Sequence, residues 1–456
     1  MNEISNKKQP LPWWRRILLA LVLTAMASFI FLLLADYLAK RQLGDEISKI
    51  TKAGQPITFL DLLDNTEPSN IDQDAARYYA EAISNMPLNE LENLKRLNIF
   101  YRKNIISLPA KQFPSDAREK ITQNLADLQP LFEKLDNAAL LPLSRFDIGI
   151  QQGIQVYKNH LNLVETAVLL LSVRTLNLIV SGKDDAAADS AISLLKLLRI
   201  FDTFPTMVLN ANKNIFVNHA CQDIHLLLEY GRPSENSLQK LQKTLAETIK
   251  TNTMEKMFLV ERIYQTEIGR NLIPRNIASQ LLQPNAPNLP ERLSLPTSSF
   301  GRLRMRRKAV QFFRDIAKLI TISRRPWPDP LDTIVNLSQS TQKPTTLISN
   351  AATFVCLTAK SLAIAHCTIL AVATERYRLS HDQLPASLND LSPEYIDSLP
   401  PDPFTGKNLL FRYDEQAYLI YSVGDNRQDD SGSIIPKPDK KTPLDYGLRI
   451  PLQKPQ

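Results

Sequence analysis

The chain has 456 residues, 12 of them glycine, and a formal net charge of +7 at pH 7. Because a single hydrophobic core stops growing at about 250–300 residues, this length predicts more than one folded unit. So few glycines favour helices and leave little material for glycine-rich phosphate loops. The positive excess suits an acidic partner or an anionic lipid surface, but it is small for this length and more typical of a generic solvated surface, and we predict no nucleic-acid partner.

The N-terminal segment predicts a membrane anchor. Residues 17–35 form an apolar run without a charge, close to the ~20 residues that a helix needs to cross a bilayer. Trp13, Trp14 and Tyr37 flank the run, as aromatic rings do at the headgroup level. A cleaved signal peptide is the alternative, because residues 25–27 have the small-x-small pattern of a cleavage site. The apolar run continues beyond that site, so we predict a retained transmembrane helix.

The charges around this span do not orient it, because Lys and Arg residues are as frequent shortly after it as before it. A short tail ahead of a single span usually stays in the cytoplasm. We therefore predict a single-pass inner-membrane protein, with residues 1–16 as a cytoplasmic tail and the C-terminal region periplasmic or otherwise extracytoplasmic.

Residues 53–282 predict a helical domain. An apolar stretch from 161 to 180 stops at Ser181-Gly182 and restarts at Asp184 with apolar residues on one face, which predicts a helical hairpin. The hairpin resembles a single tetratricopeptide unit, but no recurrence at a period of ~34 residues follows it. We therefore predict an irregular helical bundle, with a degenerate repeat array as the alternative.

Residues 283–297 contain four prolines and predict an extended linker. A helical connector, 298–345, follows, with a basic segment from residue 302 to 325. Its arginines suit contact with phosphate or lipid headgroups. Phe312 and Ile316 favour the alternative, an ordinary helix with one buried face and one solvated face. Since no aromatic residue for base stacking is interleaved with the charges at its front, residues 302–308, the segment is not typical of a single-strand nucleic-acid site.

The last part, 346–456, predicts a long helix followed by a small α+β domain. From 346 to 379 the alanine-rich pattern is apolar on most of its circumference, so this helix should be buried between the bundle and a terminal sheet. Charged residues such as Lys360 argue against a second membrane span. Alternation predicts two short antiparallel strands, 409–413 and 418–422, joined by a hairpin loop. The predicted fold class is therefore mainly α, with a short sheet at the C-terminus.

Three short motifs in this part carry a family resemblance. They are Leu384-Pro385-Ala386-Ser387-Leu388 after the long helix, Asp402-Pro403-Phe404-Thr405-Gly406 before the first strand, and Ser422-Val423-Gly424-Asp425 after the second. In this order they resemble the C-terminal domain of type II secretion pseudopilins. The resemblance implies a long helix that feeds a small antiparallel sheet and a calcium-binding loop, in a protein linked to a secretion-type assembly. Residues 1–35 differ from the family, because they contain neither its Gly cleavage site nor its Glu inside the apolar helix.

An acidic turn follows the second predicted strand. Asp425, Asn426, Asp429 and Asp430 offer side-chain oxygens, and Ca²⁺ takes about six to eight oxygen ligands that one loop can supply. The spacing is not that of an EF-hand, because Arg427 stands at the third position. These four residues are the candidate calcium site, and a hydrated acidic turn without a metal is the alternative.

Linear catalytic motifs are absent. The sequence contains no Gly-x-Ser-x-Gly, no His-Glu-x-x-His and no P-loop pattern. His219, Cys221, Asp223 and His225 are capable of binding metals, but they fall on different faces of one predicted helix. We therefore predict a non-catalytic, membrane-anchored envelope protein that acts as an interaction or scaffold component with protein partners. The alternatives are a ligand-binding module, and an enzyme whose site is assembled from distant residues.

Overall fold

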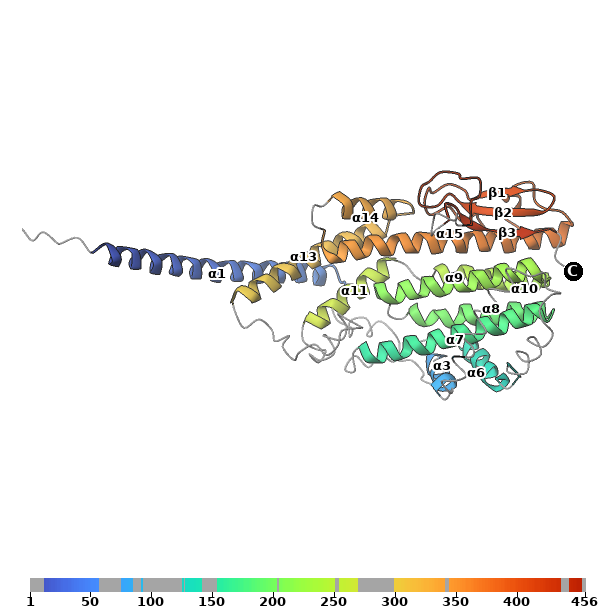
Figure 1. Cartoon of the computed structure of the whole chain (residues 1–456), viewed down its shortest axis with the longest axis horizontal. Coiled ribbons are helices and arrows are strands. Elements are labelled where there is room, and N and C mark those ends of the chain that lie inside the picture. Colours follow the sequence, from blue (N-terminus) through green and yellow to red (C-terminus); the bar gives the residue numbers. More distant parts are fainter. Residues whose placement is uncertain are drawn as a thin grey trace, which may run out of the picture.

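The computed structural model describes residues 12–56, 75–84, 92, 125–126, 128–141, 154–202, 205–250, 254–269, 299–340, 344–435 and 443–452. Within these residues the protein is mainly helical with one small antiparallel sheet, as the sequence predicts. Figure 1 shows an elongated molecule in which the first helix extends away from a helical bundle, and the sheet lies beside the far end of that bundle. The predicted linker, 283–297, lies outside the described residues.

The N-terminal helix α1 (Trp13–Lys52) has 40 residues, which corresponds to a length of about 60 Å. Its most apolar stretch buries none of its surface within the protein. The following turns run beside α13 (Ser299–Ser323), where the Arg306 guanidinium lies 2.5 Å from the Asp36 carboxylate. The helix is therefore divided into an exposed apolar half and a half that is fixed to the rest of the molecule.

The end of α1 is tied to the bundle by Arg262, a buried residue of α11 (Met254–Gly269). Its guanidinium donates one hydrogen bond to Oε1 of Gln55, at 2.7 Å, and another to the carbonyl oxygen of Pro56, at 2.9 Å. Because hydrogen bonds from a charged donor are stronger than neutral ones, this contact limits how freely α1 can move relative to the bundle.

Long helices with apolar residues on their inner faces form the bundle. They are α3 (Ala75–Ser84), α6 (Gln129–Leu140), α7 (Ile154–Val180), α8 (Asp184–Leu197), α9 (Met207–Tyr230) and α10 (Glu235–Lys250). The predicted hairpin is confirmed as α7 and α8, which pack against each other. Their turn contains Gly182 at a φ of +68°, a conformation that glycine adopts without steric cost. Asp184 and Asp185 begin α8, where the helix dipole favours negative charge.

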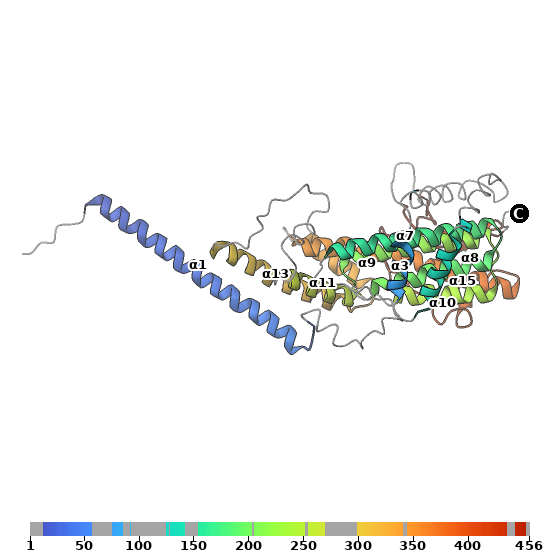
Figure 2. The same ribbon diagram turned by 90° about the horizontal axis from the view of Figure 1, so that it is seen from below.

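Helix α15 (Thr346–His381) lies between this bundle and the sheet, as predicted. Figures 1 and 2 show it running along the length of the bundle. One hydrophobic core includes Leu171 of α7, Leu227 of α9, Leu370 of α15 and Ile420 of the sheet. The predicted helical domain and the predicted C-terminal domain therefore contribute to the same core.

Three helices among the described residues are long and apolar enough to cross a membrane. Besides α1 they are the Leu161–Val180 part of α7 and α15. Most of the apolar window in each of these two is buried by other parts of the protein, 61% and 67%, against 0% for α1. Burial already removes the apolar surface of α7 and α15 from water, whereas that of α1 remains uncovered.

The C-terminal sheet has three antiparallel strands in the order β1 (Leu410–Tyr413), β2 (Ala417–Ser422) and β3 (Tyr446–Pro451). The first two confirm the predicted strands, and Tyr413 pairs with Tyr418 across them. Their hairpin is held by Asp414, whose Oδ1 accepts hydrogen bonds from the amides of Gln416 and Ala417, each at 2.8 Å.

Strand β3 is not among the strands predicted from the sequence. Tyr446, Leu448 and Ile450 are buried on one face of this strand, so the alternation that marks a strand is present.

Helix α13 and helix α14 (Asp329–Ser340) occupy the predicted connector. The buried face predicted for its basic segment is confirmed at Ile316, which has no exposed surface.

Candidate functional site

The candidate site is the loop that joins β2 to β3, and Asp402 fixes where this loop begins. The buried Asp402 carboxylate accepts hydrogen bonds from the Ser422 hydroxyl at 2.9 Å and from the Val423 amide at 3.2 Å. It also accepts one from the Phe404 amide at 2.9 Å, which forms an Asx turn at the Asp-Pro motif. Two of the motifs that carry the family resemblance are therefore in direct contact.

Two of the predicted calcium ligands each face a cation and a tyrosine. Oδ2 of Asp425 lies 2.8 Å from Nζ of Lys360 and accepts a hydrogen bond from the Tyr446 hydroxyl, also at 2.8 Å. Asp429 lies 2.6 Å from the Arg412 guanidinium and accepts a hydrogen bond from a second tyrosine hydroxyl at 2.9 Å. The two carboxylates are thus directed toward α15 and toward the sheet, respectively.

The other two candidates contact each other. The Asn426 amide nitrogen donates to Oδ2 of Asp430 at 2.6 Å. Arg427, the residue after Asn426, forms an ion pair with the Asp332 carboxylate of α14. Among the described residues, no group of three or more His, Cys, Asp and Glu side chains is placed to hold a metal. The structure brings the four candidates into one loop, and calcium binding there remains a prediction.

Several residues of this site were missed by the sequence analysis. Lys360 and Arg412 neutralise the loop carboxylates, but they lie far from the loop in the sequence. Asp445 is buried just before β3, where Oδ2 accepts a hydrogen bond from the Ser433 amide at 2.9 Å. Burial raises the pKa of Asp445 above its ordinary value. The sequence signal for Asp445 was its position directly before a segment of alternating apolar residues.

Because Asp429 is paired with Arg412, we predict that the stability of the folded protein depends on pH. Partial burial raises the pKa of Asp429, but the hydrogen bonds from Tyr421 and Ser431 and the charge of Arg412 outweigh it, so the pKa lies below its ordinary 3.8. A carboxyl whose pKa is lower in the folded state stabilises the protein above its unfolded pKa. That stabilisation is lost as the pH falls through the folded pKa.

We therefore expect Asp429→Asn to flatten the acid limb of stability. On going from about pH 6 to about pH 3, the melting temperature of the wild type should fall further than that of the variant. The difference is less than about 1 kcal/mol, because the side chain is partly exposed and solvent screens the pair. Glu415→Gln on the β1–β2 hairpin is the control and should keep the wild-type profile. Identical acid limbs for Asp429→Asn and the wild type would contradict the arrangement.

The metal-capable residues of α9 are divided among different surroundings. Cys221 and Asp223 are buried in the core, and burial raises the pKa of Cys221 to about 12. His225 instead lies at β3, where Nε2 is 3.0 Å from the carbonyl oxygen of Arg449. The three cysteines of the chain are free thiols.

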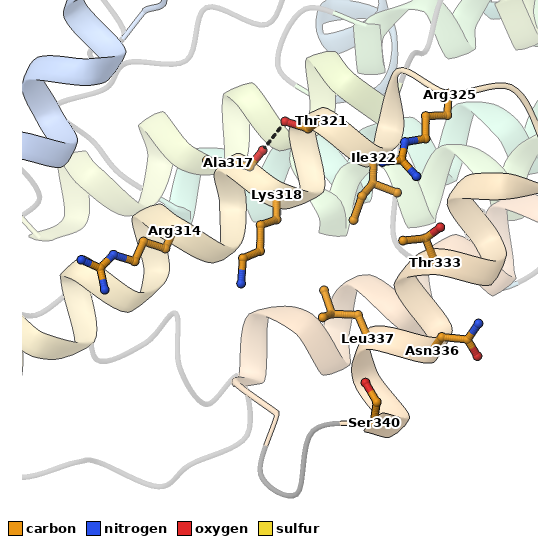
Figure 3. A pocket seen from close by; sticks show the side chains of 10 residues that line it. All are labelled: Arg314, Ala317, Lys318, Thr321, Ile322, Arg325, Thr333, Asn336, Leu337 and Ser340. Atoms are coloured by element: carbon orange, nitrogen blue, oxygen red, sulfur yellow. Dashed lines mark hydrogen bonds between the residues drawn. The ribbon is translucent and has the colours of Figure 1, made fainter.

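Two cavities lie away from the loop. The larger, about 680 Å³, is an open groove between α13 and α14, lined by Arg314, Lys318 and Arg325 on one side and Leu337 on the other (Figure 3). Apolar atoms make up most of the groove's surface, three cations lie among the lining residues, and carboxylates are absent from its described lining.

The smaller cavity, about 360 Å³, lies where the bundle meets the C-terminal domain. Leucines from α9, α10 and the chain end surround Glu375 and Arg378, whose side chains are 2.8 Å apart. Glu375 is buried, and its Oε1 accepts a hydrogen bond from the Tyr418 hydroxyl at 3.0 Å. Burial raises the pKa of Tyr418 well above its ordinary value, so this hydroxyl remains a donor.

Comparison with known proteins adds no assignment to this geometry, because no protein-family model, curated protein or solved structure matches the chain.

Proposed function

We propose that the protein is a single-pass inner-membrane protein whose bundle and pseudopilin-like C-terminal domain serve outside the membrane as an interaction or scaffold component of the cell envelope. The main support is helix α1. No residue from 17 to 34 is buried within the protein, and a large uncovered apolar surface of this length suits the hydrocarbon core of a bilayer. The rest of α1 then acts as a stalk, fixed to α11 by Arg262 and to α13 by Arg306.

The pseudopilin-like role is supported by the order of parts at the C-terminus. A long helix feeds a small antiparallel sheet, and the Asp-Pro and Ser-x-Gly-Asp motifs contact each other through Asp402 and Ser422. The loop after Ser422 is held by ion pairs on the outside of the molecule. Such a surface suits recognition of other envelope proteins better than catalysis, which usually requires a cleft with several perturbed ionisable groups.

Charges placed within the apolar stretch should release the protein from the membrane. Each Lys at the centre of a membrane helix costs ~2.5–3.5 kcal/mol of insertion free energy, so we expect Leu23→Lys together with Phe29→Lys to move much of the protein into the alkaline-extractable fraction. The control changes exposed apolar residues of α9 and α15, Val208→Lys with Leu357→Lys, and should stay in the membrane pellet. A double α1 variant that resists extraction would count against the anchor.

Partners and orientation need separate measurements. To test the orientation, a reporter enzyme that is active only outside the cytoplasm is fused to the C-terminus, and we expect it to be active. To test for partners, a photo-cross-linking residue replaces Tyr413, which is 55% exposed, and we expect it to capture envelope proteins in intact cells. A cytoplasmic reporter would exclude the proposed orientation. Reproducible isolation of the protein alone from every cross-linked membrane preparation would exclude the scaffold role.

Calcium binding by the loop is the first alternative function, and melting experiments test it. If Ca²⁺ binds with a Kd of about 10⁻⁴ M, about 1 mM ion should stabilise the fold by about 1.4 kcal/mol and raise the melting temperature by a few degrees. Asp425→Asn with Asp429→Asn should abolish the shift, whereas Glu415→Gln should retain it. An unchanged midpoint in the wild type would remove calcium from the proposal.

A ligand-binding module is the second alternative, and the cavity around Glu375 and Arg378 is the observation that favours it. It lies between the bundle and the C-terminal domain, and it combines an apolar wall with a charged pair, as small-molecule sites do. A panel of small carboxylates tested by thermal shift should then stabilise the wild type but not Arg378→Ala. If no carboxylate in the panel stabilises the wild type, the result would contradict the ligand-binding alternative and favour the scaffold role.

A further inference from the structure

The first turns of α13 lie level with the end of the apolar stretch of α1. Leu303 is buried against Ala35 and Ala39, and the next turn of α13 carries Arg306, which pairs with Asp36 at 2.5 Å. Asp36 is the first charged residue after the uncharged run. Figure 2 shows α13 beginning beside the middle of α1, and the two helices then run in the same general direction. If residues 17–35 cross the bilayer, α13 therefore begins at the membrane surface.

Exposed cations gather at this level. Arg304, Arg307 and Lys308 of α13 are exposed, as are Lys40 and Arg41 of α1. At 1.5 Å per residue, all five lie within about 8 Å of Asp36 along the two helix axes. The headgroup layer on one side of a bilayer has a similar thickness, since it extends the ~30 Å core to about 40–45 Å in total.

These five cations differ from three arginines farther along the chain. Arg314 of α13 lies 3.2 Å from Glu46, and in the turn after α13 Arg324 lies 2.8 Å from Glu255 and Arg325 lies 3.4 Å from Asp329. None of the five at the membrane level forms an ion pair with a residue that the structure describes. Carboxylates of α1, α11 and α14 thus pair with these three arginines, whereas none of the described carboxylates pairs with the five cations at the membrane level.

We propose that Arg304, Arg307 and Lys308, with Lys40 and Arg41 beside them, bind the phosphates of anionic phospholipids in the leaflet from which α1 emerges. This inference rests on the proposed membrane anchor. Arg pairs with phosphate through two parallel hydrogen bonds, and a basic segment next to a membrane helix is attracted to anionic lipid. Headgroup binding would hold α13, and through it the stalk and bundle, at a fixed height above the membrane.

Lipid retention by the full-length protein tests this proposal. The protein, in mild detergent at low salt, is offered equal amounts of phosphatidylglycerol and phosphatidylcholine, and the retained lipids are counted by native mass spectrometry. We expect the wild type to prefer phosphatidylglycerol by about tenfold or more, given the strength of Lys and Arg attraction at a membrane surface. Arg304→Gln, Arg307→Gln and Lys308→Gln together should reduce the preference to within about twofold.

Two matched variants separate this site from a general charge effect. Lys240→Gln, Lys243→Gln and Lys250→Gln remove three exposed charges from α10, at the far end of the bundle, and should keep the preference. Arg304→Lys with Arg307→Lys keeps the charge and should retain most of it. Absence of a preference in the wild type, its persistence in the α13 triple variant, or an equal loss in the α10 variant would each overturn the proposal.

Membrane anchoring of each variant is tested separately from lipid binding. Alkaline extraction of membranes should leave both triple variants in the pellet, because neither changes residues 17–35. A wild type that is itself extracted would contradict the anchor, whereas a retained wild type without lipid preference would contradict headgroup binding alone.

Discussion

Tyr418→Ala should lower the free energy of unfolding by about 3–5 kcal/mol, the cost of removing a large aromatic side chain from a core. Tyr418 has no exposed surface, and its ring fills the space between β2 and α15. Its hydroxyl also donates to the buried Glu375 carboxylate at 3.0 Å, so the variant leaves that carboxylate without one of its donors. Urea unfolding of the full-length protein in detergent, followed by circular dichroism, measures the change.

Tyr413 provides the matched control, because it pairs with Tyr418 across the β1–β2 hairpin but is 55% exposed. Tyr413→Ala should change the unfolding free energy by less than about 1 kcal/mol. Tyr418→Phe keeps the ring and removes only the hydroxyl, so its cost should be intermediate. Equal, small effects at both tyrosines would mean that the sheet does not pack on α15.

Gly447→Ala should destabilise the protein by about 1–3 kcal/mol, because a side chain there overpacks the sheet. Gly447 lies in β3, directly opposite Tyr421 of β2. An added Cβ atom would lie 2.6 Å from the Cβ atom of Tyr421 and would also collide with the Ile420 carbonyl oxygen. The strands would have to separate, and thermal melting with urea titration should report the loss.

Gly44 offers the same chemical change in open space. This residue lies within α1 with nothing within 4 Å of an added Cβ atom, and alanine favours a helix over glycine by about 0.5–1 kcal/mol. Gly44→Ala should therefore be neutral or slightly stabilising. A Gly447→Ala protein as stable as the wild type would show that β3 is not paired with β2 in this register.

Local sequence patterns were sufficient to predict the helices, turns and strands that depend only on residues close together in the chain. The uncharged run at 17–35, the stop at Gly182 and the alternation before and after Asp414 each specify a helix, a turn or a strand within a few residues. The Asp402 turn was predictable for the same reason, since its partner amide belongs to Phe404. The weak point was β3, whose alternation is present but follows a loop rich in Pro and Asp.

The sequence by itself determined the long apolar helix at the N-terminus, the helical character of the chain and the positions of the first two strands, because periodicity and turn chemistry are local properties. Only the tertiary structure decided that α13 lies beside α1, that Arg262 holds Gln55 across 207 positions, and that Asp425 and Asp429 face different cations. Those contacts join residues far apart in the chain, and their energies depend on burial and distance, which exist only once the helices have packed.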